Sequence, residues 1–157
     1  MDINKTIFPF NNVVETGFRT LCILTSLHPK LFDIETLVCL DYLCVHSGDF
    51  EPGISSLHPA NPNRQGELFV RRNIIEEGME IFIQKKLLVR AYQPTGIEYM
   101  ATELAASFLD TVSASYSLAL IERSDWLSNK VFELDNLQIQ QLVKRSGTDY
   151  SFQMLQK

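Results

Sequence analysis

GELFVRRNIIEEGMEIFIQKKLLVRAYQPTGIEYMATEL, residues 66–104, is the stretch that decides the fold of this 157-residue chain. Over residues 67–86 the apolar side chains recur at helical spacing, which predicts a long amphipathic helix with one buried face. Residues 87–92 then change to a composition that is typical of a β-strand. We therefore expect a strand to follow this helix almost without a connecting loop.

A tight turn is predicted at residues 93–96, because Pro94 suits its second position and Gly96 suits its last. Residues 97–100 alternate in polarity and predict the return strand. Thr102 is a candidate N-cap for a further helix. This order is typical of a winged helix-turn-helix. We expect a mainly α (α+β) fold with a two-stranded β-hairpin as its wing and additional C-terminal helices.

Two helices are predicted before this stretch. Asn12 and Asp33 are good N-cap residues, and apolar segments follow them over residues 13–27 and 34–45. The second segment is apolar almost all round, which is typical of a central helix. A long polar connection, residues 46–65, then leads to the helix of the hairpin stretch, and loops of this length are often functional.

The chain continues beyond the predicted wing. Helices are expected over residues 102–112 and 116–134, with a break between them at a small-residue segment, and a last short helix precedes a polar tail. We divide the chain into a winged-helix domain, residues 1–112, and a C-terminal helical extension and tail, residues 113–157.

The helix predicted over residues 116–134 has more apolar surface than one small domain needs. One stripe at helical spacing is expected to pack on the domain. A second group, Leu118, Ile121 and Trp126, lies off that stripe. Because an exposed apolar patch on a soluble chain usually marks an interface, these three residues are candidates for partner binding.

The charge balance disfavours a free-standing DNA-binding domain, which is usually basic. The chain has 14 basic and 19 acidic residues, for a net charge of −5. Residues 66–86 carry four basic and four acidic side chains, and reading base edges from a neutral helix is difficult. Candidate contacts to nucleic acid or to a partner are the basic residues near this helix and the hairpin, namely Arg64, Arg71, Arg72, Lys85, Lys86 and Arg90.

The polar loop raises the possibility of catalysis or zinc binding, because it contains His46, Ser47 and His58. A nucleophilic serine needs a histidine within hydrogen-bond reach, and zinc needs three or four ligands in a fixed geometry. The sequence has no nucleophile elbow, and a turn that ends the second helix explains Ser47 equally well. It also has no phosphate-binding loop. We expect no catalytic residue, no metal and no cofactor.

The cysteines and the hydropathy indicate a cytoplasmic protein. The cysteines Cys22, Cys39 and Cys44 are odd in number and form no Cys-x-x-Cys pair, which argues against zinc and against a disulfide framework. No apolar run reaches the length of about 18 residues that a membrane span requires. The first residues do not resemble a signal peptide.

Five segments of the sequence together resemble one bacterial protein family. They are NVVETGFR (12–19), LDYLCVHSGD (40–49), SLHP (56–59), RQGELFVRR (64–72) and ATELA (101–105). Their combination resembles the middle component of bacterial ABC three-component systems, and in particular the small accessory subunit of Lamassu anti-phage and anti-plasmid defence. The resemblance covers about residues 7–127, and the tail after Leu134 lies outside it.

This resemblance implies a small winged-helix subunit without catalysis of its own. Its partners would be a large SMC-like or Rad50-like ABC ATPase with a long coiled coil and a third subunit that carries a toxic effector, often a nuclease. The small subunit would sit at the ATPase heads of a hetero-oligomer that senses foreign or damaged DNA, and DNA would be contacted mainly through the complex.

Three functions are thus to be compared. The first is a non-catalytic accessory or regulatory subunit of an SMC-like defence complex. The alternative is a winged-helix transcription regulator that binds DNA directly as a dimer. The third is an enzyme built on the loop between His46 and His58. A neighbouring gene for a long ATPase, or co-purification with that ATPase, would favour the first.

Overall fold

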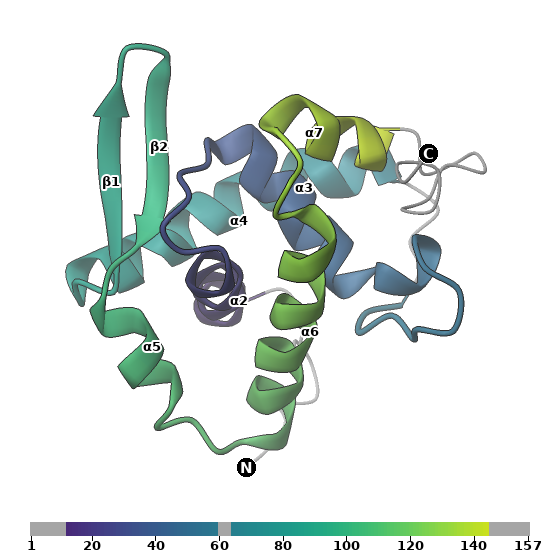
Figure 1. The fold of residues 1–157 in the computed structure, drawn as a ribbon, viewed down its shortest axis with the longest axis horizontal. Helices are drawn as coiled ribbons and strands as arrows, with labels where there is room; N and C mark the ends of the chain where they lie inside the picture. Colours follow the sequence, from purple (N-terminus) through teal and green to yellow (C-terminus); the bar gives the residue numbers. More distant parts are fainter. Residues whose placement is uncertain (1–11, 60–63, 145–157) are drawn as a thin grey trace.

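The computed structural model describes residues 12–59 and 64–144 of the chain. This part is mainly helical, with one two-stranded antiparallel hairpin that projects from the helical body (Figure 1). In chain order the elements are α2 (Val13–Ser26), α3 (Ile34–Val45), the 3-10 turn η1 (Ser47–Asp49), α4 (Arg64–Gln84), β1 (Leu88–Gln93), β2 (Gly96–Ala101), α5 (Leu104–Leu109), α6 (Ser115–Val131) and α7 (Asn136–Lys144).

Both N-terminal helices begin at the predicted caps. The Asn12 side chain accepts a hydrogen bond from the backbone N–H of Glu15 at 2.7 Å. Asp33 accepts one from the N–H of Thr36 at 2.9 Å. Each bond satisfies one of the amides that the first turn of a helix leaves without a partner. The caps therefore fix where α2 and α3 start.

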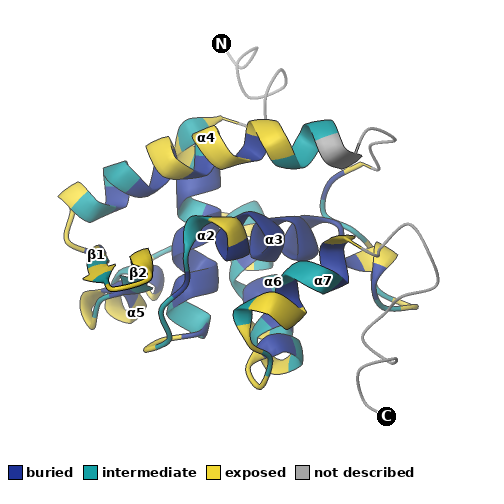
Figure 2. Cartoon of the chain, turned by 90° about the horizontal axis from the view of Figure 1, so that it is seen from above, coloured by how far each residue is buried: buried dark blue, intermediate teal, exposed yellow. Residues whose placement is uncertain are grey.

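Helix α3 occupies the centre of the molecule. Every residue from Thr36 to Val45 is buried, and the helix is almost uniformly dark in the burial colouring of Figure 2. An apolar surface on all sides needs partners on all sides, as the sequence predicts for this helix. One hydrophobic cluster surrounds it and includes Leu21 and Leu24 from α2, Ile75 and Met79 from α4, Leu120 and Leu127 from α6, and Ile139 and Leu142 from α7.

Helices α2 and α4 touch backbone to backbone at a pair of glycines. A Cβ atom added to Gly17 would lie 2.4 Å from the carbonyl oxygen of Gly78, and one added to Gly78 would lie 2.6 Å from the amide nitrogen of Gly17. Real Cβ atoms do not approach backbone atoms so closely. The absence of both side chains therefore sets the distance between these two helices.

Helix α4 ends two residues earlier than predicted. It stops at Gln84, and Lys86 adopts a left-handed conformation with φ 64°. The Lys86 N–H donates to the Ile83 carbonyl and the Leu87 N–H donates to the Phe82 carbonyl, each at 2.9 Å. This is the bonding of a Schellman motif, with lysine at the position that glycine usually occupies. It redirects the chain straight into β1.

The hairpin has the predicted turn. Strands β1 and β2 pair in antiparallel register from Leu88 opposite Ala101 to Gln93 opposite Gly96, which leaves Pro94 and Thr95 as a two-residue connection. An isolated bridge from Phe32, in the segment between α2 and α3, pairs with Tyr99 on the far side of β2. The hairpin is thereby attached to the body at its base (Figure 1).

The C-terminal helices pack on the same core as the N-terminal ones. Helix α5 is shorter than predicted and ends at Leu109, and the predicted break before α6 is present. Residues from both sides of residue 112 contribute to one hydrophobic cluster. The predicted tail beyond residue 144 lies outside the described residues.

All three cysteines, Cys22, Cys39 and Cys44, are free and buried. Burial raises the pKa of the Cys39 and Cys44 thiols to about 12, so both are uncharged thiols near neutral pH. In the described ranges no helix has the length and hydropathy that crossing a membrane requires.

Candidate functional site

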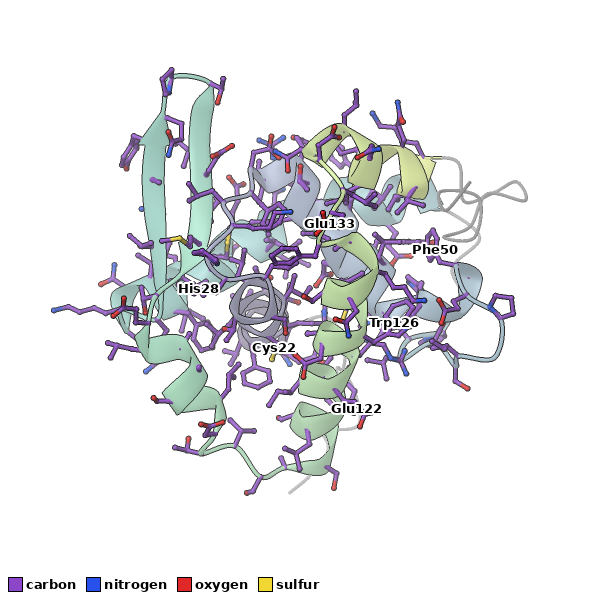
Figure 3. All side chains as sticks on the ribbon, in the orientation of Figure 1. Cys22, His28, Phe50, Glu122, Trp126 and Glu133 are labelled. Atoms are coloured by element: carbon purple, nitrogen blue, oxygen red, sulfur yellow. The ribbon has the colours of Figure 1, made fainter. Side chains whose placement is uncertain are left out.

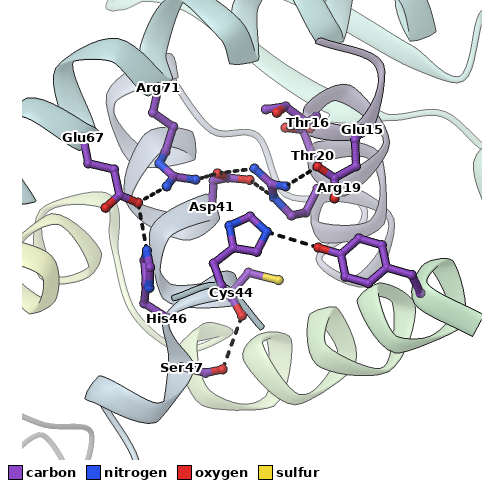
Figure 4. A network of polar contacts seen from close by, with 12 residues as sticks. Glu15, Thr16, Arg19, Thr20, Asp41, Cys44, His46, Ser47, Glu67 and Arg71 are labelled. Carbon is purple, nitrogen blue, oxygen red and sulfur yellow. Dashed lines mark hydrogen bonds and ion pairs between the residues drawn. The ribbon is translucent and has the colours of Figure 1, made fainter. Parts of the chain in front are cut away.

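A buried carboxylate lies where α2, α3 and α4 meet. Asp41 of α3 is fully buried and accepts two hydrogen bonds from Arg19 of α2, at 2.7 Å to Nε and 3.0 Å to Nη2. Arg71 of α4 also donates to the Asp41 carboxylate. This geometry holds one anion between two guanidinium groups from different helices (Figure 4).

Further charged groups surround this centre. Glu15 accepts from Arg19 at 3.2 Å, one turn away on α2. Glu67 pairs with Arg71 one turn away on α4, and its carboxylate also lies 2.8 Å from the Nε2 atom of His46. The network therefore starts at Glu15 on α2, passes through Asp41 on α3 to Arg71 and Glu67 on α4, and ends at His46, the C-cap residue of α3.

The charges of the network stabilise one another. Burial by itself raises the pKa of Asp41, but the charges and hydrogen bonds of Arg19 and Arg71 hold it well below its usual range. Burial by itself lowers the pKa of Arg19, but the charge and hydrogen bonds of Asp41 outweigh this effect and raise the pKa overall. Burial likewise opposes the charged form of Glu67, whereas hydrogen bonding to His46 and the charge of Arg71 lower its pKa. These groups are therefore charged throughout the neutral pH range.

The sequence interpretation did not include this network. Beyond the first turns, which carry Glu15 and Glu35, Arg19 and Asp41 are the only charged residues of α2 and α3. That is the signal that could have revealed them, because charged residues are almost never fully buried unless they are paired. The pairing itself joins positions 22 and 30 residues apart, Arg19 to Asp41 and Asp41 to Arg71. Local sequence patterns do not indicate such pairs.

Of the polar-loop candidates, His46 belongs to this network, whereas Ser47 and His58 bond to groups on α3 and α6. Ser47 is fully buried, donates to the Cys44 carbonyl at 3.3 Å and accepts from Arg123 of α6. His58 Nε2 forms a hydrogen bond with the Tyr116 hydroxyl at 3.1 Å. Ser47 belongs to the turn η1 that follows α3, as the turn interpretation predicts. The arrangement fixes the loop against α6 and leaves the Ser47 hydroxyl without solvent access.

His58 is expected to make the stability of the chain depend on pH. Burial, together with the nearby guanidinium of Arg19, lowers the pKa of His58 to about 3, against about 6.5 in an unfolded chain. As the pH falls below about 6.5, the unfolded state takes up a proton that the folded state does not. Stability is therefore fully present above that pH and decreases below it, by up to about 1.4 kcal/mol per pH unit.

The measurement is urea unfolding between pH 7 and pH 5, in the wild type and in His58→Gln. Glutamine retains a polar group for Tyr116 and does not titrate, so the variant should show a shallower decrease. Equal slopes in the two proteins would contradict the assignment of a buried neutral His58.

The candidate basic residues differ in their exposure and in their partners. Arg71 is only 6% exposed and is committed to Asp41 and Glu67, so it does not lie on the surface as a phosphate contact would require. The exposed Arg72 pairs with Glu35 of α3. Lys85 and Lys86 are exposed and lie beyond the end of α4. Arg90 of β1 pairs with Glu80 at 2.6 Å. The side chain of Arg64 lies outside the described part of the chain.

The three apolar candidates on α6 differ in their environment. Leu118 is 47% exposed. Ile121 and Trp126 are partly buried and pack against the hydrophobic core. The Trp126 side chain points from α6 toward the loop that carries Phe50 (Figure 3), and its Nε1 atom donates to Glu51 at 3.3 Å. Of the three, Leu118 is the most exposed, with about half of its surface open to solvent.

Helix α6 therefore holds the loop after α3 through three polar side chains. Trp126 donates to Glu51, Lys130 forms an ion pair with Glu51 at 2.7 Å, and Arg123 donates to the Ser55 carbonyl at 2.7 Å. These contacts connect residues roughly 70 positions apart in the chain. They place the polar loop in one position against the C-terminal helices.

Trp126→Ala is expected to lower the stability of the isolated chain by about 1–3 kcal/mol, less than the 3–5 kcal/mol typical of a fully buried aromatic residue. The loss comes from apolar contact with the core and from the bond to Glu51. Thermal unfolding measures the change, and hydrogen exchange of residues 47–58 should accelerate. Leu118→Ala is the matched control and should leave the melting temperature unchanged. An unchanged melting temperature in Trp126→Ala would show that the indole does not stabilise the fold.

Comparison with known proteins assigns a family. A family model described as ABC-three component (ABC-3C) system Middle Component 2 matches residues 9–153, nearly the whole chain. The chain belongs to this family. The match extends past the end of the sequence resemblance near residue 127, so the last helix and part of the tail of this middle component also belong to the family pattern. No curated protein and no solved structure matches the chain.

Proposed function

We propose that this middle component is a non-catalytic accessory subunit that docks on an SMC-like ABC ATPase and helps to control an effector nuclease. The complex would act in Lamassu-type bacterial defence against phage or plasmids. The family match over residues 9–153 carries the proposal, because a component of a three-component system works with other subunits. The sequence resemblance supports an SMC-like ATPase and a nuclease effector as the partners.

The chemistry of the described side chains supports a binding role. The interior charges Arg19, Asp41 and Arg71 are committed to one another, and Ser47 has no access to solvent. A catalytic group must reach its substrate, at least through one water. The network instead joins three helices through buried ion pairs, which is a structural role.

We also propose that the fold is a winged helix with the hairpin as its wing. The order of three helices, α2, α3 and α4, followed by β1 and β2 supports this proposal. The bridge between Phe32 and Tyr99 supports it further, because it attaches the segment between the first two helices to the outer side of the hairpin. In this reading α4 is the third helix, whose exposed side would face DNA in a DNA-binding protein.

Co-expression of the three components with an affinity tag on this subunit tests the proposal. We expect the ATPase to co-purify stoichiometrically, and cells that lack this subunit to lose protection against phage or plasmids. Glu77→Lys changes the charge of an exposed residue of α4 and serves as the control. It should still co-purify with the ATPase, because a change in net charge by itself should not abolish the association. Full protection without the subunit, or no association with the ATPase, would contradict the proposed role.

The alternative is a winged-helix transcription regulator, which the order of helices and hairpin also fits. Against it, the exposed side of α4 carries Glu76 and Glu77, and its basic residue Arg72 is paired with Glu35. Fluorescence anisotropy with duplex DNA distinguishes the two. We expect weak binding without sequence preference that decreases steeply with added salt. Nanomolar, sequence-dependent binding at physiological salt would favour the regulator.

A further inference from the structure

A groove lies between the hairpin and the helical body of the middle component. Its volume is about 670 Å³. It lies beside the outer edge of β2, next to the start of α3, on the side where Figure 1 shows the hairpin standing away from the body. Its walls come from the start of α3 (Asp33, Ile34, Glu35), from α4 (Arg72, Glu76), from residues 95–99 of the hairpin and from Asn136.

The outer edge of β2 is open at this groove. Tyr99 exchanges two main-chain hydrogen bonds with Phe32, at 3.1 Å and 2.8 Å, so the peptide groups of Tyr99 point away from β1. In an antiparallel pair this direction alternates, and the peptide groups of Ile97 therefore also point away from β1. Within the described ranges no backbone group bonds to Ile97 on that side. Unpaired strand edges of this kind accept an added strand.

The tip of the hairpin also presents uncovered apolar side chains. Tyr92 of β1 and Ile97 of β2 are cross-strand neighbours. Tyr92 is 76% exposed and Ile97 is 44% exposed. The hairpin stands away from the helical body at this end (Figure 1), so a large part of both side chains is open to solvent. An extended segment bound at Ile97 would cover part of this apolar pair.

The charge around the groove is negative. Four carboxylates, those of Asp33, Glu35, Glu76 and Glu98, line it with a single guanidinium, that of Arg72. Arg72 is already paired with Glu35. Among the described residues, Asp33, Glu76 and Glu98 have no ion-pair partner. The groove therefore attracts basic groups and repels phosphates.

We propose that this groove binds an extended Lys- or Arg-bearing segment of a partner subunit, which adds to β2 as a strand at Ile97. The open main-chain groups of Ile97 supply hydrogen bonds, and Glu76 and Glu98 select basic side chains. A second copy of this chain fits less well, because it brings the same acidic groove and a net charge of −5. The inference rests on the proposed role as a docking subunit and names the surface that docks.

The test uses the full-length subunit and the purified ABC ATPase of the same system. Glu76→Lys/Glu98→Lys should weaken their association at least tenfold at about 0.15 M salt, because it turns attraction into repulsion at the bound segment. Glu77→Lys/Glu103→Lys is the matched control, since it changes two exposed acidic residues outside the groove and alters the net charge equally. The control should stay within about threefold of the wild type.

The position of the segment is checked with a photo-crosslinking amino acid at Thr95 in the same complex. We expect it to capture one extended segment of the partner that is rich in Lys or Arg. Glu76→Gln/Glu98→Gln repeats the affinity measurement if the lysine variant has a lowered melting temperature, and it should weaken binding in the same direction.

The two proposals fail in different ways. If the wild type does not bind the ATPase, both are wrong. If the wild type binds but the groove and control variants lose affinity equally, or if the cross-link maps to DNA or to an acidic segment, only the groove assignment is wrong. A tenfold loss confined to the groove variant, together with a basic cross-linked segment, supports it.

Discussion

Asp41→Ala is expected to lower the free energy of unfolding by about 3–5 kcal/mol, the range measured when one partner is removed from a buried ion pair. Asp41 is the anion between Arg19 and Arg71, which are 1% and 6% exposed. Without it two positive charges remain in the interior next to each other. Because domains are typically stable by only about 5–15 kcal/mol, the variant should lose a large share of the total stability.

Urea unfolding at pH 7 measures this loss, and Asp41→Asn separates charge from volume. Asparagine has nearly the same shape but no charge, so it should recover little of the lost stability. Glu80→Ala is the control, because it removes an ion pair with Arg90 that lies at the surface, and surface pairs contribute little. A small effect of Asp41→Ala, similar to that of Glu80→Ala, would show that the network does not hold the helices together.

The same network predicts how the effect of the mutation depends on pH. Arg19 and Arg71 lower the pKa of Asp41 against the effect of burial, so its contribution is fully present above the unfolded value of about 3.9. The contribution decreases as the pH falls below that value. The difference in stability between wild type and Asp41→Ala should therefore be constant from about pH 8 to pH 5 and should become smaller in acid.

Gly78→Ala is expected to destabilise the chain by about 1–3 kcal/mol, the usual cost of forcing extra atoms into a packed contact. At an exposed helical position the same change would stabilise by roughly 1 kcal/mol, because alanine is the better helix former. Here the added Cβ would lie 2.6 Å from backbone atoms of α2. Gly78→Val adds two more carbons at the same place, so its loss should be larger than that of Gly78→Ala.

Thermal and urea unfolding of Gly78→Ala and Gly78→Val test this contact, with Glu77→Val as the matched control. Glu77 is the neighbouring exposed residue of α4, so its substitution by valine reports the helix propensity alone. We expect the control to lose only a few tenths of a kcal/mol. If Gly78→Val were as stable as Glu77→Val, the close approach of α2 and α4 would not be required by the fold.

Local chemistry explains why several elements could be predicted from the sequence. The caps at Asn12 and Asp33 and the limits of α3 follow from residues within one helical turn of each other. The hairpin turn follows from Pro94 and Gly96 in the same way. The end of α4 was predicted two residues too late, because Lys86 takes a left-handed conformation that sequence patterns assign to glycine.

The sequence indicated that helix α6 has a large apolar surface. It did not indicate which part of the chain covers that surface. Trp126 and Ile121 were predicted as partner contacts, and both are partly buried against the core. The environment of Trp126 also depends on the loop after α3, which folds back onto α6. That contact joins Trp126 to Glu51, 75 positions away. The partner-binding role of Leu118, which is about half exposed, stays a prediction.

The sequence alone determined the helical segments, the hairpin, the acidic balance and the family, because periodicity, caps, composition and short motifs are local properties. Only the tertiary structure decided that Asp41 pairs with Arg19 and Arg71, that Gly17 meets Gly78, and that an acidic groove lies beside the open edge of β2. Each of these depends on the positions of elements that are distant in the chain. Those positions are set by the packing of the whole core. The free energy of that packing is a small difference between hydrophobic burial and the loss of conformational entropy, and neither can be summed from local sequence.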